Sequence, residues 1–160
     1  MDLDQYVLEW EVVGDAGTKR VFETLLDVHG PRLSHAFVDA ITDEPDLPAT
    51  AARAKEELEK MGAHQRLGDR PRSRWGLVRA LRGDPNMAVE LDLQDADDLR
   101  ILRDFGLFSI HMVAYLEDDD VPEIMSSDTG TAFTFFADEE LIEQLVRVAK
   151  IPRAACVRIT

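Results

Sequence analysis

The chain has 160 residues and a formal net charge of −14, with 45% hydrophobic and 31% charged residues. These values exclude a disordered chain and fit one folded domain, which we expect to span residues 1–160. No apolar run reaches the roughly 20 residues needed to cross a bilayer, and the amino-terminal MDLDQYVLEWEVV is unlike a secretory signal. We therefore expect a cytoplasmic protein without membrane contact.

The excess of acidic residues restricts the class of partner. It repels the phosphates of nucleic acid at long range and favours encounter with a basic protein. Asp outnumbers Glu and Arg outnumbers Lys, which is also typical of a protein from a saline cytoplasm. A GC-rich genome would give the same bias of Arg over Lys, and a solvated acidic surface without a partner is a further interpretation.

The first elements are a strand and a helix. Apolar and polar residues alternate from Tyr6 to Val12, which predicts a strand. Gly14 and Gly17 then predict a turn. Thr18 is placed to cap a helix that runs to about Val28.

The middle of the chain contains one well-defined helix. Residues 32–41, before it, fit both a helix and a strand, so both interpretations stay open. The acidic, proline-containing linker 43–48 leads into a helix from Ala49 to Met61, whose apolar stripe is rich in alanine. Gly62 is expected to end this helix.

The second half of the chain begins with a strand, a short helix and a longer strand. Apolar residues alternate with polar ones from Met87 to Gln94, which predicts a half-buried strand. Asp95 is expected to cap a short helix that ends near Gly106. The segment Leu107–Leu116 is apolar on both faces, which predicts a central strand.

The last elements repeat the order strand, helix, strand. A strand at Thr131–Ala137 precedes Asp138, which is expected to cap an amphipathic helix. A closing strand follows at Arg153–Thr160. Its Cys156 is the one cysteine of the chain, and we expect it to be a small buried hydrophobe.

These elements predict an α+β fold. We expect a mixed or mostly antiparallel sheet of about five strands, with helices packed mainly on one face. A doubly wound parallel sheet is disfavoured because no helix separates the predicted strands 107–116 and 131–137.

The arginine-rich segment 66–82 is the strongest local feature, with six arginines and one aspartate. Arg70, Arg72 and Arg74 alternate, so an extended backbone would point their guanidinium groups to one side, just before Trp75. Such a group can bind an anion or an acidic partner, and Trp75 can stack on a guanidinium. Alternatively, these arginines pair with the chain's own carboxylates, which their abundance favours. The overall acidity makes nucleic acid the weakest interpretation.

An acidic loop at 117–128 is the opposite pole of the charge distribution. Its run Asp118, Asp119 and Asp120 is a candidate contact for a basic partner, and a solvated loop is the alternative. The loop lacks the spacing and the central glycine of a calcium-binding EF-hand. We therefore expect no metal here.

The histidines do not form a recognisable site. None of the four has the spacing of a zinc motif, and no cofactor-binding motif is convincing, so we expect neither a metal nor a cofactor. They are His29, His35, His64 and His111.

Two stretches resemble a family of small, uncharacterised bacterial α+β domains. LGDRPRSRWGL at Leu67–Leu77 resembles that family's segment of glycine, basic residues and tryptophan, and FTFFADEELIEQLVRVAKIPRAACVRI at Phe133–Ile159 resembles its closing strand, helix and strand. The resemblance implies that the family's domain covers about residues 33–160, with the first strand and helix as an addition. It implies no activity and no catalytic residue.

No motif in the sequence assigns an activity. The charge, the size and the lack of a catalytic signature favour a small protein-binding module of the inhibitor, antitoxin or immunity-protein type, which acts through surface charge. The alternative is an enzyme or small-ligand-binding protein that holds an anionic ligand with segment 66–82. A concave pocket lined by Arg70, Arg72, Arg74 and Trp75 would favour the alternative, and a flat surface would favour a protein partner.

Overall fold

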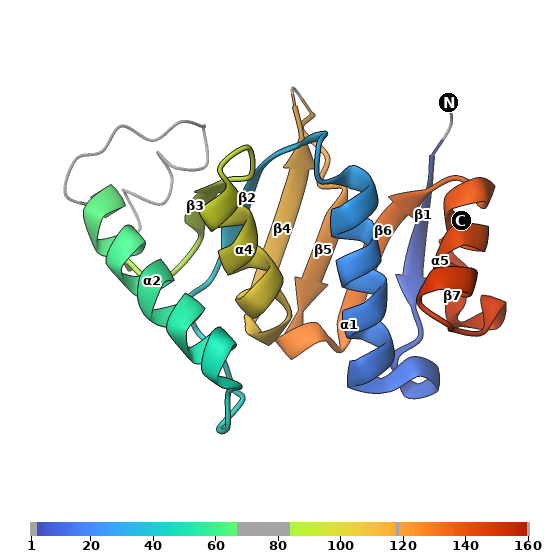
Figure 1. Cartoon of the computed structure of the whole chain (residues 1–160), viewed down its shortest axis with the longest axis horizontal. Helices are drawn as coiled ribbons and strands as arrows, with labels where there is room; N and C mark the ends of the chain where they lie inside the picture. Colours follow the sequence, from blue (N-terminus) through green and yellow to red (C-terminus); the bar gives the residue numbers. More distant parts are fainter. Residues whose placement is uncertain (1–2, 67–83, 118, 160) are drawn as a thin grey trace.

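A seven-stranded sheet organises the part of the chain that the computed structural model describes, residues 3–66, 84–117 and 119–159 (Figure 1). The strand order is β3-β2-β4-β5-β6-β1-β7, and every neighbouring pair is antiparallel. The strands are β1 (Asp4–Leu8), β2 (Leu33–Val38), β3 (Val89–Asp92), β4 (His111–Leu116), β5 (Ile124–Ser127), β6 (Ala132–Ala137) and β7 (Cys156–Arg158).

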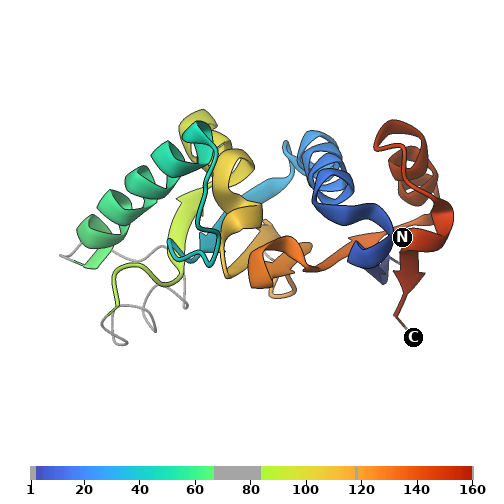
Figure 2. The same ribbon diagram turned by 90° about the horizontal axis from the view of Figure 1, so that it is seen from below.

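Four described α-helices lie on one face of this sheet, as Figure 2 shows. They are α1 (Trp10–His29), α2 (Ala49–Arg66), α4 (Ala96–Phe105) and α5 (Glu139–Val148). Short 3-10 turns follow α4 (Gly106–Phe108), β5 (Asp128–Gly130) and α5 (Arg153–Ala155). None of the described helices is long and apolar enough to span a membrane. The predicted α+β class is confirmed, and the main core lies between the helices and the sheet.

The expectation of about five strands was wrong, because two strands lack a clear pattern of their own. The ambiguous segment 32–41 contains β2, which pairs with both β3 and β4. The second missed strand, β5, lies inside the predicted acidic loop 117–128 and is only four residues long. Both segments are strands because neighbours on either side satisfy their backbone groups.

The first helix begins earlier than its predicted start. Trp10 and Val12 belong to α1 and not to a strand, and the indole of Trp10 donates to Asp15 Oδ1 at 2.8 Å. Gly14 interrupts the helix with φ 64° and ψ −176°, a conformation open to glycine. Thr18 is therefore not the N-cap: it is buried within α1, and its hydroxyl donates to the carbonyl oxygen of Gly14 at 3.0 Å.

The predicted end of α2 at Gly62 was also wrong, since the helix continues to Arg66. A tertiary contact stabilises the extra turn. The side chain of Gln65 donates to the carbonyl oxygen of Glu90 at 2.8 Å and accepts from the Glu90 amide at 3.1 Å. The last turn of the helix is thereby attached to β3, at one edge of the sheet.

Several local predictions are confirmed. Asp95 Oδ1 accepts from the amides of Asp97 and Asp98 at 2.8 and 3.3 Å, and Asp138 accepts from the Leu141 amide at 2.8 Å, so both cap their helices. Cys156 is buried and reduced, and burial raises the pKa of its thiol.

The predicted central strand is confirmed in β4, although it begins at His111 and not at Leu107. It pairs with β2 and β5 and is apolar on both faces. Its side chains contribute Met112 and Ala114 to the main core, and Val113 and Tyr115 to a smaller cluster with Phe37. The ring of Tyr115 also stacks on that of His35, with 4.9 Å between the centroids.

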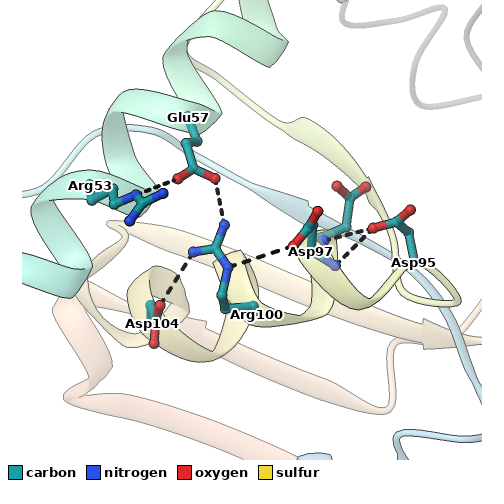
Figure 3. Close-up of polar contacts among 7 residues, drawn as sticks. Arg53, Glu57, Asp95, Asp97, Arg100 and Asp104 are labelled. Atoms are coloured by element: carbon teal, nitrogen blue, oxygen red, sulfur yellow. Dashed lines mark hydrogen bonds and ion pairs between the residues drawn. The ribbon is translucent and has the colours of Figure 1, made fainter.

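An ionic network joins α2 to α4 on the helical side of the molecule (Figure 3). The guanidinium of Arg100 on α4 contacts Glu57 on α2 at 2.6 Å, Asp104 at 3.5 Å and Asp97 at 4.0 Å. Glu57 also receives a hydrogen bond from Arg53 at 3.1 Å. These arginine contacts hold the pKa of Glu57 below its usual range, chiefly through the hydrogen bond from Arg100.

Replacing Arg100 with alanine should lower the free energy of unfolding by about 1–2 kcal/mol, because three carboxylates lose their shared cation. Arg53→Ala is the matched control, since its side chain is 79% exposed and its ion pair is with Glu57; we expect it to cost about 0.5 kcal/mol or less. Urea unfolding in low and in molar salt measures both changes. The Arg100 effect should shrink with salt, and an effect no larger than that of Arg53→Ala would contradict the network.

Candidate functional site

The antiparallel pairing brings several acidic segments to one end of the sheet. Leu33 pairs with Leu116 and Asp4 with Ala137, so β3, β4 and β6 end where β1 and β2 begin. This end is the upper edge of the sheet in Figure 1. We call it the acidic end and define it by nine carboxylates: Asp4, Asp95, Asp97, Glu117, Asp119, Asp120, Asp138, Glu139 and Glu140.

Most carboxylates of the acidic end face solvent. Three of the nine have arginine partners: Asp4 with Arg158, Glu139 with Arg153, and Asp97 with Arg100. Among the described residues, none of the other six has a recorded ion pair. Asp119 shapes the turn between β4 and β5, because its Oδ1 accepts from the Val121 amide at 2.9 Å.

The structure describes only some of the site residues that were predicted from the sequence. Asp119 and Asp120 are exposed on the turn between β4 and β5. Asp118 lies outside the described residues. The predicted anion or partner site, Arg70, Arg72, Arg74 and Trp75, also lies outside them, so its shape and its partners stay predictions.

A buried histidine and a buried glutamate meet beneath the acidic end. His29 is in the last turn of α1, and Glu123 directly precedes β5. The Glu123 amide donates to the Ala114 carbonyl oxygen at 2.8 Å, and its carbonyl oxygen accepts from the Phe136 amide at 3.0 Å. His29 Nε2 lies 3.5 Å from Glu123 Oε1, and the two side chains are only 5% and 4% exposed.

The pair is short of hydrogen bonds. Neither ring nitrogen of His29 forms a hydrogen bond, and Glu123 Oε1 accepts none. The 3.5 Å distance between His29 Nε2 and Glu123 Oε1 is therefore a close approach that lacks hydrogen-bond geometry. Buried polar atoms without a partner are uncommon in folded proteins and each calls for a physical reason. The unpartnered atoms of His29 and Glu123 make this pair the best candidate for a functional site among the described residues.

Burial favours the neutral form of both side chains. Loss of solvation raises the pKa of Glu123 to about 7, against a smaller lowering by the charge of Arg32 and a smaller raising by Asp119. Loss of solvation also lowers the pKa of His29, helped by Arg32 and opposed by Asp138. Below about pH 7 the carboxyl group of Glu123 is therefore mostly protonated, and burial favours the uncharged imidazole of His29.

A pocket of about 370 Å³ opens next to His29, between the end of α1 and the start of α5. Its lining combines apolar residues with charged ones and includes His29, whose two ring nitrogens have almost no accessible surface. The lining residues are Leu3, Val28, His29, Arg32, Asp138, Glu140, Leu141 and Gln144. The pocket thus borders His29 and two carboxylates of the acidic end, Asp138 and Glu140, whereas Glu123 is not part of its lining.

Sequence reasoning did not find this pair. It treated His29 as one of four scattered histidines and Glu123 as one carboxylate of a solvated loop. The proline before Glu123 and the apolar Ile124-Met125 after it are local signs that the loop had already ended. No local sign connects Glu123 to His29, which lies far away in the chain.

No metal centre is formed by the described residues: within residues 3–66, 84–117 and 119–159 no group of three or more His, Cys, Asp or Glu side chains could hold an ion. Comparison of the chain with protein-family models, curated proteins and solved structures gave no significant match. The resemblance of Leu67–Leu77 and Phe133–Ile159 to small bacterial α+β domains stays a prediction.

Proposed function

We propose that this chain is a small acidic protein-binding module of the cytoplasm, of the inhibitor, antitoxin or immunity-protein type, which recognises a basic partner through surface charge. The observation that supports the proposal is the acidic end. Carboxylates from four separate parts of the chain gather there, at the tips of five strands. A single acidic loop would account for only three of the nine.

The electrostatic argument concerns encounter and orientation. A net charge of −14 attracts a basic protein from a distance, and a concentration of unpaired carboxylates at one end orients it on arrival. Exposed charges at the rim of an interface mainly raise the association rate, and this contribution falls as salt screens it. Binding to the partner should therefore weaken with salt.

The test compares two triple variants with the same change of charge. Glu117→Gln/Asp119→Asn/Asp120→Asn neutralises the turn of the acidic end. Asp43→Asn/Glu44→Gln/Asp46→Asn neutralises the exposed linker that follows β2 at the opposite end of the sheet. Each tagged protein is used to capture partners from its native host, and the captured proteins are quantified by mass spectrometry.

We expect the acidic-end variant to lose about tenfold or more of a captured basic protein, and the linker variant to keep it. Equal retention by both variants would contradict a role for the acidic end. Equal loss from both would show that net charge acts without a defined surface.

A further inference from the structure

We propose that residues of α2, of α4 and of the turn before β7 close both edges of the sheet, and so prevent the strands of a second copy from pairing there. Among the described strands, β3 and β7 each pair on one side only, at the two ends of the strand order (Figure 1). The outer side of such a strand presents backbone groups to which another chain can bind, and natural proteins protect it.

The register of β3 identifies the backbone groups that point away from the sheet. The Leu93 amide, directly after β3, donates to the Ser34 carbonyl oxygen of β2 at 3.0 Å. Successive residues of an antiparallel strand alternate in the direction of their backbone hydrogen bonds. The amide and carbonyl groups of Glu90 and Asp92 therefore point outward.

All four of these outward groups have partners within the chain. Gln65, in the last turn of α2, accepts from the Glu90 amide at 3.1 Å and donates to the Glu90 carbonyl oxygen at 2.8 Å. Asp98 Oδ2 on α4 accepts from the Asp92 amide at 2.8 Å, and the Asp92 carbonyl oxygen accepts from the Asp95 amide at 2.9 Å. The side-chain amide of Gln65 thus makes the two bonds that a residue of an added antiparallel strand would make.

The opposite edge is closed by Arg153. The Ala155 carbonyl oxygen and the Ile159 amide bond the chain at β1, both at 2.8 Å, so Cys156 and Arg158 face outward. Arg153 satisfies both backbone groups of Cys156: its guanidinium donates to the carbonyl oxygen at 3.1 Å, and its own carbonyl oxygen accepts from the amide. Because β7 has three residues, Arg158 is the one outward residue of this strand that Arg153 leaves for pairing.

Like charges add to the protection of β3. In an antiparallel pair of two β3 strands, each outward residue would face Glu90 or Asp92 of the second copy. Like charges directly opposite each other destabilise a strand pair, and the whole chain has a net charge of −14. Salt screens this repulsion, so at about 0.5 M sodium chloride we expect the bonds of Gln65 to be the main barrier to pairing.

The experiment compares two glutamine variants of the full chain. Gln65→Leu removes both bonds to Glu90 and keeps a side chain of similar size. Gln144→Leu is the control, because it makes the same change at another half-buried helical position, on α5. Sedimentation in low salt and at about 0.5 M sodium chloride measures the mass over a range of concentrations, and urea unfolding verifies that each variant is folded.

We expect Gln65→Leu to form dimers at about 0.5 M sodium chloride, with a dissociation constant at least about tenfold lower than that of the unmodified protein or of Gln144→Leu. Hydrogen exchange locates the contact. In dilute Gln65→Leu the Glu90 amide should exchange about tenfold or more faster than in the unmodified protein, and it should be protected again as the dimer forms.

Arg153→Met tests the other edge with a side chain that is 46% exposed. Arg147→Met is its control, since it makes the same charge change on an exposed residue in the last turn of α5. We expect Arg153→Met to strengthen association about threefold relative to this control. The effect should be smaller than that of Gln65→Leu, because the guanidinium covers one backbone group and the Gln65 amide covers two.

Three results would overturn the inference. Equal association of Gln65→Leu and Gln144→Leu would show that an added leucine, and not an open strand, holds the copies together. A dimer in which the Glu90 amide stays unprotected would contradict pairing at β3. Monomers in every variant at both salt concentrations would show that the edges need no closure by side chains. If Gln65→Leu does not fold, Arg153→Met beside Arg147→Met decides by the same criteria.

Discussion

Phe22→Ala is expected to lower the free energy of unfolding by about 3–5 kcal/mol, a large part of the about 5–15 kcal/mol that a domain of this size usually has. The side chain is 1% exposed, and its ring meets that of Phe133 edge to face, with 6.1 Å between the centroids. It thus joins α1 to β6. Removing it loses buried apolar surface and leaves a cavity that a close-packed core cannot fill.

The environment of Phe22 restricts any relaxation. A β-carbon on Gly106 would stand 3.1 Å from the tip of the Phe22 ring, so the glycine after α4 makes room for it. Val12→Ala is the control, since Val12 lies on the same helix and is 54% exposed; we expect it to change the free energy by about 0.5 kcal/mol or less. Denaturant unfolding followed by circular dichroism measures both. A loss below about 1 kcal/mol for Phe22→Ala would contradict the packing of α1 on the sheet.

Replacing His29 or Glu123 should uncover two opposite dependences of stability on pH. The pKa of Glu123 rises from 4.5 to about 7 on folding. The folded state then holds a proton that the unfolded state has released. The contribution of Glu123 to the free energy of unfolding therefore falls as pH rises from about 4.5 to 7. A pKa change of that size corresponds to about 3 kcal/mol.

His29 acts in the other direction. Its pKa is lowered below 6.5 on folding, so the unfolded state binds the proton that the folded imidazole rejects. The contribution of His29 to the free energy of unfolding therefore falls as pH falls below 6.5. In the unmodified protein the two effects offset each other, because unfolding transfers one proton from Glu123 to His29 without changing the number bound.

The single variants separate the two effects. Relative to the unmodified protein, His29→Gln should become less stable as pH rises from 4.5 to 7, by up to about 3 kcal/mol, and Glu123→Gln should become less stable as pH falls below 6.5. The double variant should show neither trend. Urea unfolding at a series of pH values measures the free energies, and trends of the same sign in both single variants would show that the buried pair is not neutral.

Local sequence patterns alone determined the fold class and several element boundaries. Asp95 and Asp138 were recognisable as N-caps because an aspartate before a helical pattern satisfies the first free amides within its own turn. The central position of β4 followed from apolar residues on both faces. Each of these inferences depends on residues close together in the chain.

Tertiary structure decided the rest. β2 and β5 are strands because their neighbours in the sheet pair with them, and α2 continues past Gly62 because Gln65 is attached to β3. The buried pair of His29 and Glu123 depends on the antiparallel order, which brings the end of α1 above the start of β5. Their neutral state results from burial, and no pattern of neighbouring residues records which groups the folded chain removes from water.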